Sequence, residues 1–376
     1  MTQSLYIRPI ALAESPQSEE GEAVRLAGGM VYASRFALII RDGAAIVSRQ
    51  RLAAPEIEGA LALLPDALAT EGQAQWADLR ATHAPLDLSL KGGGARTIRL
   101  DQPQVMGILN VTPDSFSDGG KFLDDPEVAH AHAAAMLEAG AALIDVGGES
   151  TRPGAAAVWE GDELKRVIPA IERLAASGAA ISTDTRRAAV MEAALSAGAH
   201  IINDVSALRH DPRSLELAAR SGVPVVLMHA PGEGEDLHAD GSYGDVVLDV
   251  FDWLKARRDA AIGAGIVREK IILDPGIGFG KSVAENLALI NALPLFHALG
   301  QPLLVGVSRK RLIGALSNES PAHQRLGGSI ALAVKALDAG VQMLRVHDVA
   351  ETVQAVRVWR GLRDAALTDF GQLVAG

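Results

Sequence analysis

Polar side chains follow an apolar segment at residues 105–109, and their types suit metal and phosphate chemistry. Asn110 comes directly after this segment, and Asp114 and Asp118 follow in a stretch that Pro113 and a Gly-Gly pair prevent from continuing a strand. Amide and carboxylate oxygens are ligands of hard divalent cations, which are often shared with substrate phosphates. A polar loop after a strand is most often only a connection, so the other loops decide its meaning.

The same order of an apolar strand and then polar residues recurs along the chain from residue 104. The predicted strands are 105–109, 142–146, 180–183, 200–203, 224–228, 270–273, 302–307 and 342–346. The predicted helices are 128–139, 160–176, 186–197, 214–221, 243–263, 284–299, 324–339 and 350–366. Eight strand-helix units predict a (β/α)8 TIM barrel.

An open doubly wound sheet is the alternative fold. Its dinucleotide-binding form carries a glycine-rich first turn, and the chain has no G-x-G-x-x-G. Residues 274–282 resemble a phosphate loop, but Pro275 stands where the motif needs a glycine.

In a (β/α)8 barrel, residues just past the carboxyl ends of the strands meet at one mouth. One group there could hydrogen-bond the edge of a flat heterocycle: Asp184, Asn203, Asp274 and Lys310. An unpaired buried carboxylate is unfavourable, so we expect Asp274 and Lys310 to support one another.

A second group at the mouth suits an anion. Arg345 and His347 alternate with Val346, so they point to the same side of a strand. Arginine binds phosphate oxygens bidentately, and the loops after strands seven and eight are the usual phosphate position of such barrels. The group comprises Asn110, Thr151, Arg152, Arg345 and His347. A single histidine in an apolar strand is otherwise most often a core residue.

These segments strongly resemble dihydropteroate synthase. The resemblance rests on residues 110–120, 144–154, 183–185, 202–204, 227–229, 273–281, 306–314 and 345–348. It covers residues 104 to 365, and the segment before them lies outside the family's core. It implies a transferase of folate biosynthesis that condenses 6-hydroxymethyl-7,8-dihydropterin pyrophosphate with para-aminobenzoate to 7,8-dihydropteroate and pyrophosphate.

The resemblance also implies roles for individual residues. The pterin would be held by Asp184, Asn203, Met228, Asp274, Phe279 and Lys310. The pyrophosphate would be held by Asn110, Thr151, Arg152, Arg345 and His347. Aminobenzoate would contact Phe116, Pro153, Lys310 and Arg311. Mg²⁺ would bind at Asn110 and Asp118, and the catalytic set would be Asp114, Asp118, Arg152, Lys310, Arg345 and His347.

The chemistry implied is a dissociative, SN1-like departure of Mg-bound pyrophosphate. Metal and cationic side chains would stabilise the developing anion, and the weakly basic aniline would need no strong general base. The resemblance further implies a homodimer and inhibition by sulfonamides. Two departures stand out: Arg311 replaces a serine common in the family, and the loop 230–235 lacks the usual pattern.

Two other functions are weighed against this one. A methyltransferase that binds a methylated folate would need the heterocycle group but neither the anion group nor the 110–120 loop. A non-catalytic pterin-binding protein would be expected to lack one of the catalytic residues, and none is missing.

Composition limits the remaining possibilities. Residues 1–100 hold 10 Lys or Arg and 11 Asp or Glu, a balance of −1, so the other 276 residues carry about −10 of the net −11. Such a charge argues against a nucleic-acid-binding protein. The absence of cysteine, of a membrane span and of a secretory signal at the start favours a cytoplasmic enzyme.

The first hundred residues differ from the rest. Strands are expected at 6–12, 30–40 and 44–51, a helix at 55–69 and a weaker one at 73–82. The Lys-Gly-Gly-Gly run at 91–94 is expected to be a flexible joint. We therefore predict a small α+β extension, 1–100, which serves as a lid, a bottom plug or an interface, and a catalytic barrel, 101–376.

Overall fold

The computed structural model describes residues 3–13, 22–112, 126–150, 158–232, 236–239 and 241–367. In this part of the chain, no helix combines the length and apolar character that a membrane crossing requires.

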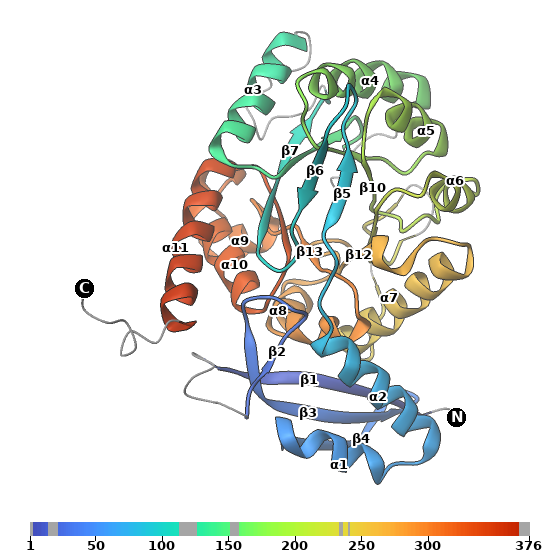
Figure 1. The fold of residues 1–376 in the computed structure, drawn as a ribbon, viewed down its shortest axis with the longest axis vertical. Coiled ribbons are helices and arrows are strands. Elements are labelled where there is room, and N and C mark those ends of the chain that lie inside the picture. The colour runs from blue at the N-terminus through green and yellow to red at the C-terminus, as the bar shows by residue number, and fades with distance from the viewer. Residues whose placement is uncertain are drawn as a thin grey trace.

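Eight parallel strands form the centre of the molecule (Figure 1). They are β7 (Gln104–Asn110), β8 (Leu143–Gly147), β9 (Ile181–Asp184), β10 (Ile201–Asp204), β11 (Val225–Met228), β12 (Ile271–Asp274), β13 (Leu304–Val305) and β14 (Met343–Val346). Their order is β12-β11-β10-β9-β8-β7-β14-β13, and a parallel bridge between Leu273 and Leu303 joins the two ends. The predicted (β/α)8 barrel is confirmed, and the open sheet is excluded.

Helices follow the strands and surround the barrel. They are α3 (Pro126–Ala139), α4 (Glu160–Ala176), α5 (Ala188–Ala197), α6 (Ser214–Ser221), α7 (Val246–Gly263), α8 (Val283–Asn291), α9 (Arg311–Leu316), α10 (Leu326–Asp338) and α11 (Val349–Leu367). Because helices cover the outside and side chains fill the inside, most strand residues are buried, as their continuous apolar sequences predict.

Two helices differ from the prediction. The segment expected as one helix at 284–299 is α8 followed by a 3₁₀ helix, Leu293–Leu299, because Pro294 cannot continue the α-helical hydrogen bonds. Helix α9 was not predicted, since six residues are too few for a clear helical period.

Side chains inside the barrel form layers, because residues two apart on a strand share a face. The first inward residue of each strand is apolar, as in Met106, Leu143, Val226 and Met343. Two residues later the same face carries polar groups on several strands, including Asp145, Asn203, Asp274 and Arg345. The barrel is therefore apolar at its amino-terminal end and polar at the opposite end.

An antiparallel sheet precedes the barrel. It contains β1 (Gln3–Ala13), β2 (Val24–Arg25), β3 (Tyr32–Asp42) and β4 (Ala45–Ala53), and its helices are α1 (Ile57–Ala62) and α2 (Asp66–Arg80). The predicted helix 55–69 is interrupted because Pro65 fixes the start of α2.

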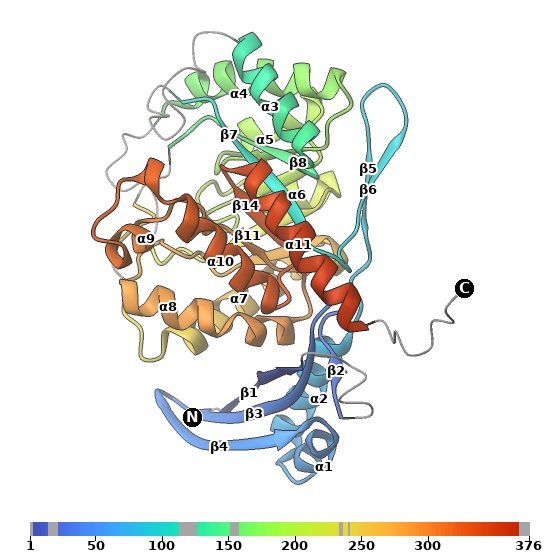
Figure 2. The same ribbon diagram turned by 90° about the vertical axis from the view of Figure 1, so that its left-hand side faces the viewer.

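This sheet packs beside α7, away from the barrel mouth (Figure 2). The Tyr6 ring lies edge-on to Phe251, 5.4 Å between centroids, and its hydroxyl donates to Asp252 at 2.7 Å. Arg41 pairs with Asp249 at 2.6 Å. Shared apolar and polar contacts thus hold the extension against the barrel's side.

The expected flexible joint at 91–94 is instead the turn of a hairpin, and that prediction was wrong. Strands β5 (Leu86–Ser89) and β6 (Ala95–Ile98) pair antiparallel across it. Leu86, Leu88 and Ile98 are buried in one cluster with the apolar residues at the barrel's amino-terminal end. The hairpin therefore closes the end opposite the mouth (Figure 2).

Candidate active site

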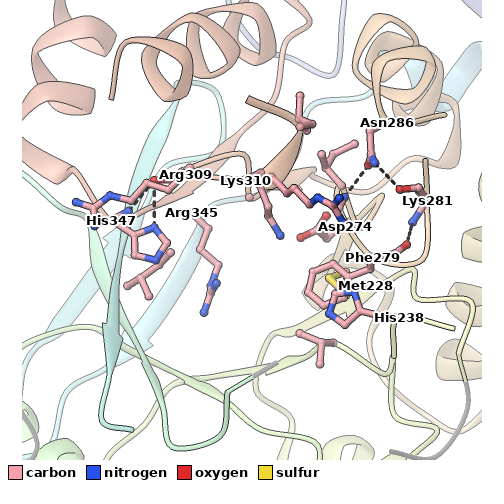
Figure 3. Close-up of a pocket in the computed structure, with 18 of the residues that line it drawn as sticks. Met228, His238, Asp274, Phe279, Lys281, Asn286, Arg309, Lys310, Arg345 and His347 are labelled. Carbon is pink, nitrogen blue, oxygen red and sulfur yellow. Dashed lines mark hydrogen bonds between the residues drawn. The ribbon is translucent and has the colours of Figure 1, made fainter. Parts of the chain in front are cut away.

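A cavity of about 950 Å³ opens at the carboxyl ends of the barrel strands (Figure 3). Ten of the residues proposed from the sequence line it: Asn110, Asp184, Asn203, Met228, Asp274, Phe279, Lys310, Arg311, Arg345 and His347. The other six lie outside the described residues: Asp114, Phe116, Asp118, Thr151, Arg152 and Pro153. The structure thus brings every described member of the predicted site into one space.

Arg345 joins the two groups that the sequence analysis kept apart. Its Nε donates to Asp145 and its Nη2 to Asp184, both at 2.6 Å, so one guanidinium holds carboxylates from β8 and β9. Burial lowers the pKa of Arg345, but the charges of these carboxylates outweigh it and raise the pKa above its ordinary value. The arginine is therefore a fixed cation beside the heterocycle group.

Asp184 has an unusual proton affinity for a carboxyl group. Burial raises its pKa to about 7, while the charge of Arg345 opposes this and the neighbouring Asp145 adds to it. A carboxyl group whose pKa lies near 7 can either accept or donate a hydrogen bond, depending on the ligand in the cavity.

Asp274 and Lys310 are two further ionisable groups of the cavity, and their charges act on one another. Burial raises the pKa of Asp274 to about 6, against the opposing effects of a hydrogen bond from the Gly276 N–H, at 2.7 Å, and the Lys310 charge. Burial likewise lowers the pKa of Lys310 to about 8, and the Asp274 charge opposes that shift. The charge of each group thus favours the charged form of the other, as the sequence analysis expected.

An apolar wall lies beside this pair. Met228 and Phe279 belong to a buried cluster with Val205, and Lys310 Nζ lies 4.5 Å from the centre of the Phe279 ring. His238 stacks on Phe279 with 4.8 Å between ring centroids and an interplanar angle of 11° (Figure 3). The sequence analysis missed His238, because only the folding of its loop brings it to the wall.

Lys281 is a second residue that the sequence analysis missed. Its ammonium group donates to the carbonyls of Gly276, at 2.8 Å, and Phe279, at 3.0 Å, and burial lowers its pKa to about 7. Asn286 accepts from the Gly278 N–H at 2.6 Å. The segment that resembled a phosphate loop is thus held by its own lysine and shapes the wall.

Two described members of the anion group, Arg345 and His347, lie at the end of β14. His347 and Arg345 both line the cavity, as their alternation predicted. Ser308 accepts from the His347 backbone N–H at 3.2 Å, and its hydroxyl lies 3.1 Å from Nδ1. The backbone of Arg309 has a positive φ of 56°, which is strained for a residue other than glycine. Its side chain donates to Asp348. Such strain is typical of functional loops.

Glu149, at the end of β8, is held by a buried network that was also missed. It accepts from Arg186 at 2.9 Å and from Arg187 at 3.0 Å, and Arg187 pairs with Glu163 at 2.6 Å. Glu149 also lines the cavity. The network therefore holds Glu149 in place at the rim of the cavity.

Asn110 is the described residue that suits the predicted metal. Its side chain lines the cavity, and Gly147 leaves room beside it, since an added Cβ would lie 3.7 Å from the amide oxygen. Within the described ranges, no three His, Cys, Asp or Glu residues gather as a metal site. A cation there would take Asn110, the undescribed Asp118 and non-protein oxygens, a set that suits Mg²⁺.

Comparison with known proteins gives a consistent result. Residues 106–347 match the family described as pterin binding enzyme. The dihydropteroate synthase of Escherichia coli (strain K12) is 48% identical over 266 residues, which span 70% of this chain and 92% of that protein.

Solved structures are similarly close. The Xanthomonas albilineans dihydropteroate synthase with 4-aminobenzoic acid has 49% identity and a TM-score of 0.68, and the match covers 74% of this chain and 99% of that one. The same enzyme with 7,8-dihydropteroate gives 47% and 0.65, covering 74% and 98%. The Yersinia pestis enzyme in a sulfonamide complex gives 47% and 0.69, covering 74% and 100%.

Proposed function

Because the chain belongs to the dihydropteroate synthase family of pterin-binding enzymes, which are transferases, we propose that it joins 6-hydroxymethyl-7,8-dihydropterin pyrophosphate to para-aminobenzoate. The observation that carries this proposal is the cavity itself. It combines acceptors for a heterocycle, at Asp184, Asn203 and Asp274, with cations for a leaving anion.

The pterin ring would lie among these acceptors. Asp184 and Asp274 provide carboxyl oxygens for its N–H groups, and Lys310 provides a donor for its carbonyl oxygen or ring nitrogen. Met228 and Phe279 offer apolar contact to the faces of the ring. Since both carboxyl groups have raised pKa values and lie beside cations, they can stay buried without large unpaired charge.

The pyrophosphate would lie towards Asn110, Arg345 and His347. Two of these groups are held before substrate arrives, since Arg345 is fixed by two carboxylates and His347 by Ser308. Donors that need no reorganisation stabilise charge that develops in the transition state. Thr151 and Arg152 belong to the same proposal, although they lie outside the described residues.

We propose a dissociative displacement at this site. The bond to the leaving oxygen lengthens first, with negative charge collecting near Arg345 and His347 and positive charge on the pterin methylene near Asp184 and Asp274. Mg²⁺ at Asn110 and Asp118 would supply further neutralisation of the pyrophosphate when bound. The amine then attacks the methylene carbon, and the proton that it loses can pass to the departing pyrophosphate, so no strong general base is required.

Aminobenzoate would enter from the side of Lys310 and Arg311. Arg311 is the first residue of α9 and is exposed at the cavity, so its guanidinium can attract the carboxylate. Phe116 and Pro153 stay part of the proposal as aminobenzoate contacts that would exclude water, and Asp114 stays part of it as a member of the catalytic set. All three lie outside the described residues. Inhibition by sulfonamides follows if these compounds occupy the same place.

Three broader features also stay proposals. They are a homodimer, a cytoplasmic location and a division of the chain into residues 1–100 and 101–376. The hairpin β5–β6 packs into the barrel, so a boundary near residue 85 agrees better with the packing than one at 100.

The decisive experiment measures pyrophosphate release. We expect release only when Mg²⁺, the pterin substrate and aminobenzoate are all present, with dihydropteroate formed in equal amount. Transfer of a methyl group from a methylated folate would favour the alternative enzyme. Tight pterin binding without any release would show a non-catalytic pterin-binding protein.

A further inference from the structure

Asp145 lies behind the candidate site rather than in it. Its side chain is wholly buried, on the inward face of β8 two residues after Leu143, and it does not line the cavity. One of its oxygens, Oδ2, accepts from Arg345 Nε at 2.6 Å and from Asn203 Nδ2 at 3.0 Å. A single buried atom therefore connects two cavity residues from β14 and β10.

The contact with Arg345 fixes the direction of the guanidinium. Because Nε is committed to Asp145 and one Nη2 hydrogen to Asp184, the plane of the group is set by two strands. The remaining N–H groups are left for a ligand. Without Asp145 the guanidinium would have one anchor in place of two, and could rotate about it.

The contact with Asn203 fixes which end of the amide meets a ligand. Asp145 Oδ2, already accepting from Arg345, is an acceptor, so the amide must present its nitrogen to it. The amide oxygen of Asn203 is consequently left for the cavity, which this residue lines. The ligand edge that meets Asn203 must then carry an N–H donor.

We propose that Asp145 is a positioning residue that makes the site specific for a heterocycle with a donor edge. It acts by holding Arg345 and the Asn203 amide in one orientation, with no contact to substrate. This inference rests on the proposed function only for the identity of the heterocycle. The orientation itself follows from the two hydrogen bonds to one buried oxygen.

The test compares Asp145→Ala with Asp145→Asn. Alanine removes the acceptor, whereas asparagine keeps one oxygen that can face both donors. For Asp145→Ala we expect the Kd for 6-hydroxymethylpterin, measured by calorimetry, to rise about 10- to 100-fold, the range for losing charge-assisted hydrogen bonds. Asp145→Asn should recover most of this loss. The KM for aminobenzoate should change less than twofold in both variants.

Asp78→Ala is the control. Asp78 also pairs with an arginine, Arg268, at 2.9 Å, and neither residue lines the cavity. We expect both variants to lower the melting temperature and only Asp145→Ala to weaken pterin binding. Equal pterin affinities of Asp145→Ala and wild type, or equal losses in Asp145→Ala and the control, would overturn the proposal.

A measurement on the wild type covers the case in which Asp145→Ala does not fold. In a crystal of the unaltered protein with 6-hydroxymethylpterin, Asn203 Nδ2 should stay within hydrogen-bond distance of Asp145, with Oδ1 facing a ring N–H. A ring acceptor facing the outer amide atom of Asn203, or loss of the contact between Asn203 and Asp145, would refute the inference. The calorimetric and crystallographic experiments do not depend on turnover, so failure of pyrophosphate release would count against the proposed function alone.

Discussion

Replacing Arg345 with alanine removes the cation that joins the two halves of the site. The substitution takes away one donor aimed at the leaving group and leaves Asp145 and Asp184 without their shared partner. Two effects should therefore appear together, one on catalysis and one on stability.

The catalytic effect is estimated from one lost donor to a developing anion, about 2–4 kcal/mol, which corresponds to a roughly 30- to 1,000-fold lower kcat/KM. Breaking a buried ion pair by removing one partner is destabilising by about 3–5 kcal/mol. Here the loss should be smaller, about 1–3 kcal/mol, because Arg345 is 21% exposed and Asp184 can take up a proton near neutral pH.

Pyrophosphate release at varied pterin substrate concentrations measures the first effect, and thermal unfolding measures the second. Arg345→Lys keeps the charge but lacks the planar guanidinium, which donates to the two carboxylates from separate nitrogens, so its activity should fall between those of alanine and wild type. Arg268→Ala removes an arginine paired with Asp78 at 2.9 Å, away from the cavity, and should leave kcat/KM within twofold. A change below twofold in Arg345→Ala would refute the assignment.

Three further predictions concern proton uptake and the barrel floor. Burial raises the pKa of Asp274 from 3.8 to about 6, so its contribution to the free energy of unfolding is fully present below pH 3.8 and is lost as the pH rises through 6. Asp274→Asn should remove this pH dependence, about 3 kcal/mol, in denaturant titrations of the substrate-free protein. The Nε2 atom of His297 lies 2.9 Å from the Ala339 carbonyl oxygen, and burial lowers the pKa of this histidine to about 4. The free energy of unfolding should therefore fall as the pH decreases from 6.5 through 4. His297→Gln should weaken this pH dependence, and an unchanged midpoint of acid unfolding would contradict the prediction. Leu88→Ala should lower the free energy of unfolding by about 2–5 kcal/mol, and a chain starting at Arg99 should be less stable still, with both checked by urea unfolding.

The sequence predicted the barrel well because its strands are short, apolar and separated by clear helices. Helices α4 and α6 have the predicted bounds, Glu160–Ala176 and Ser214–Ser221. The family resemblance is confirmed by the comparisons. The hairpin at 86–98 escaped notice because Lys91 and three glycines indicate a bend without saying what packs on either side of it.

The sequence could predict those residues of the candidate site that follow from their position on a strand. It could not predict which side chains form hydrogen bonds with one another. Asp184, Asn203, Asp274 and Arg345 follow apolar strand residues, and the barrel brings strand ends together whatever their sequence separation. Asp145 comes two residues after Leu143 and so lies on the same face of the strand. This pattern was present in the sequence, but the site prediction did not use it.

By itself, then, the sequence determined the residue types at the mouth and the layer in which each would lie, because a strand alternates its faces with a period of two. Only the tertiary structure decided which residues contact one another. One guanidinium binds two carboxylates, Lys281 donates to carbonyls of its own loop, and a hairpin covers the amino-terminal end of the barrel. The reason is physical. Periodicity is a local property of the backbone, whereas a hydrogen bond between residues 145 and 345 exists only after the intervening chain has folded around a common axis.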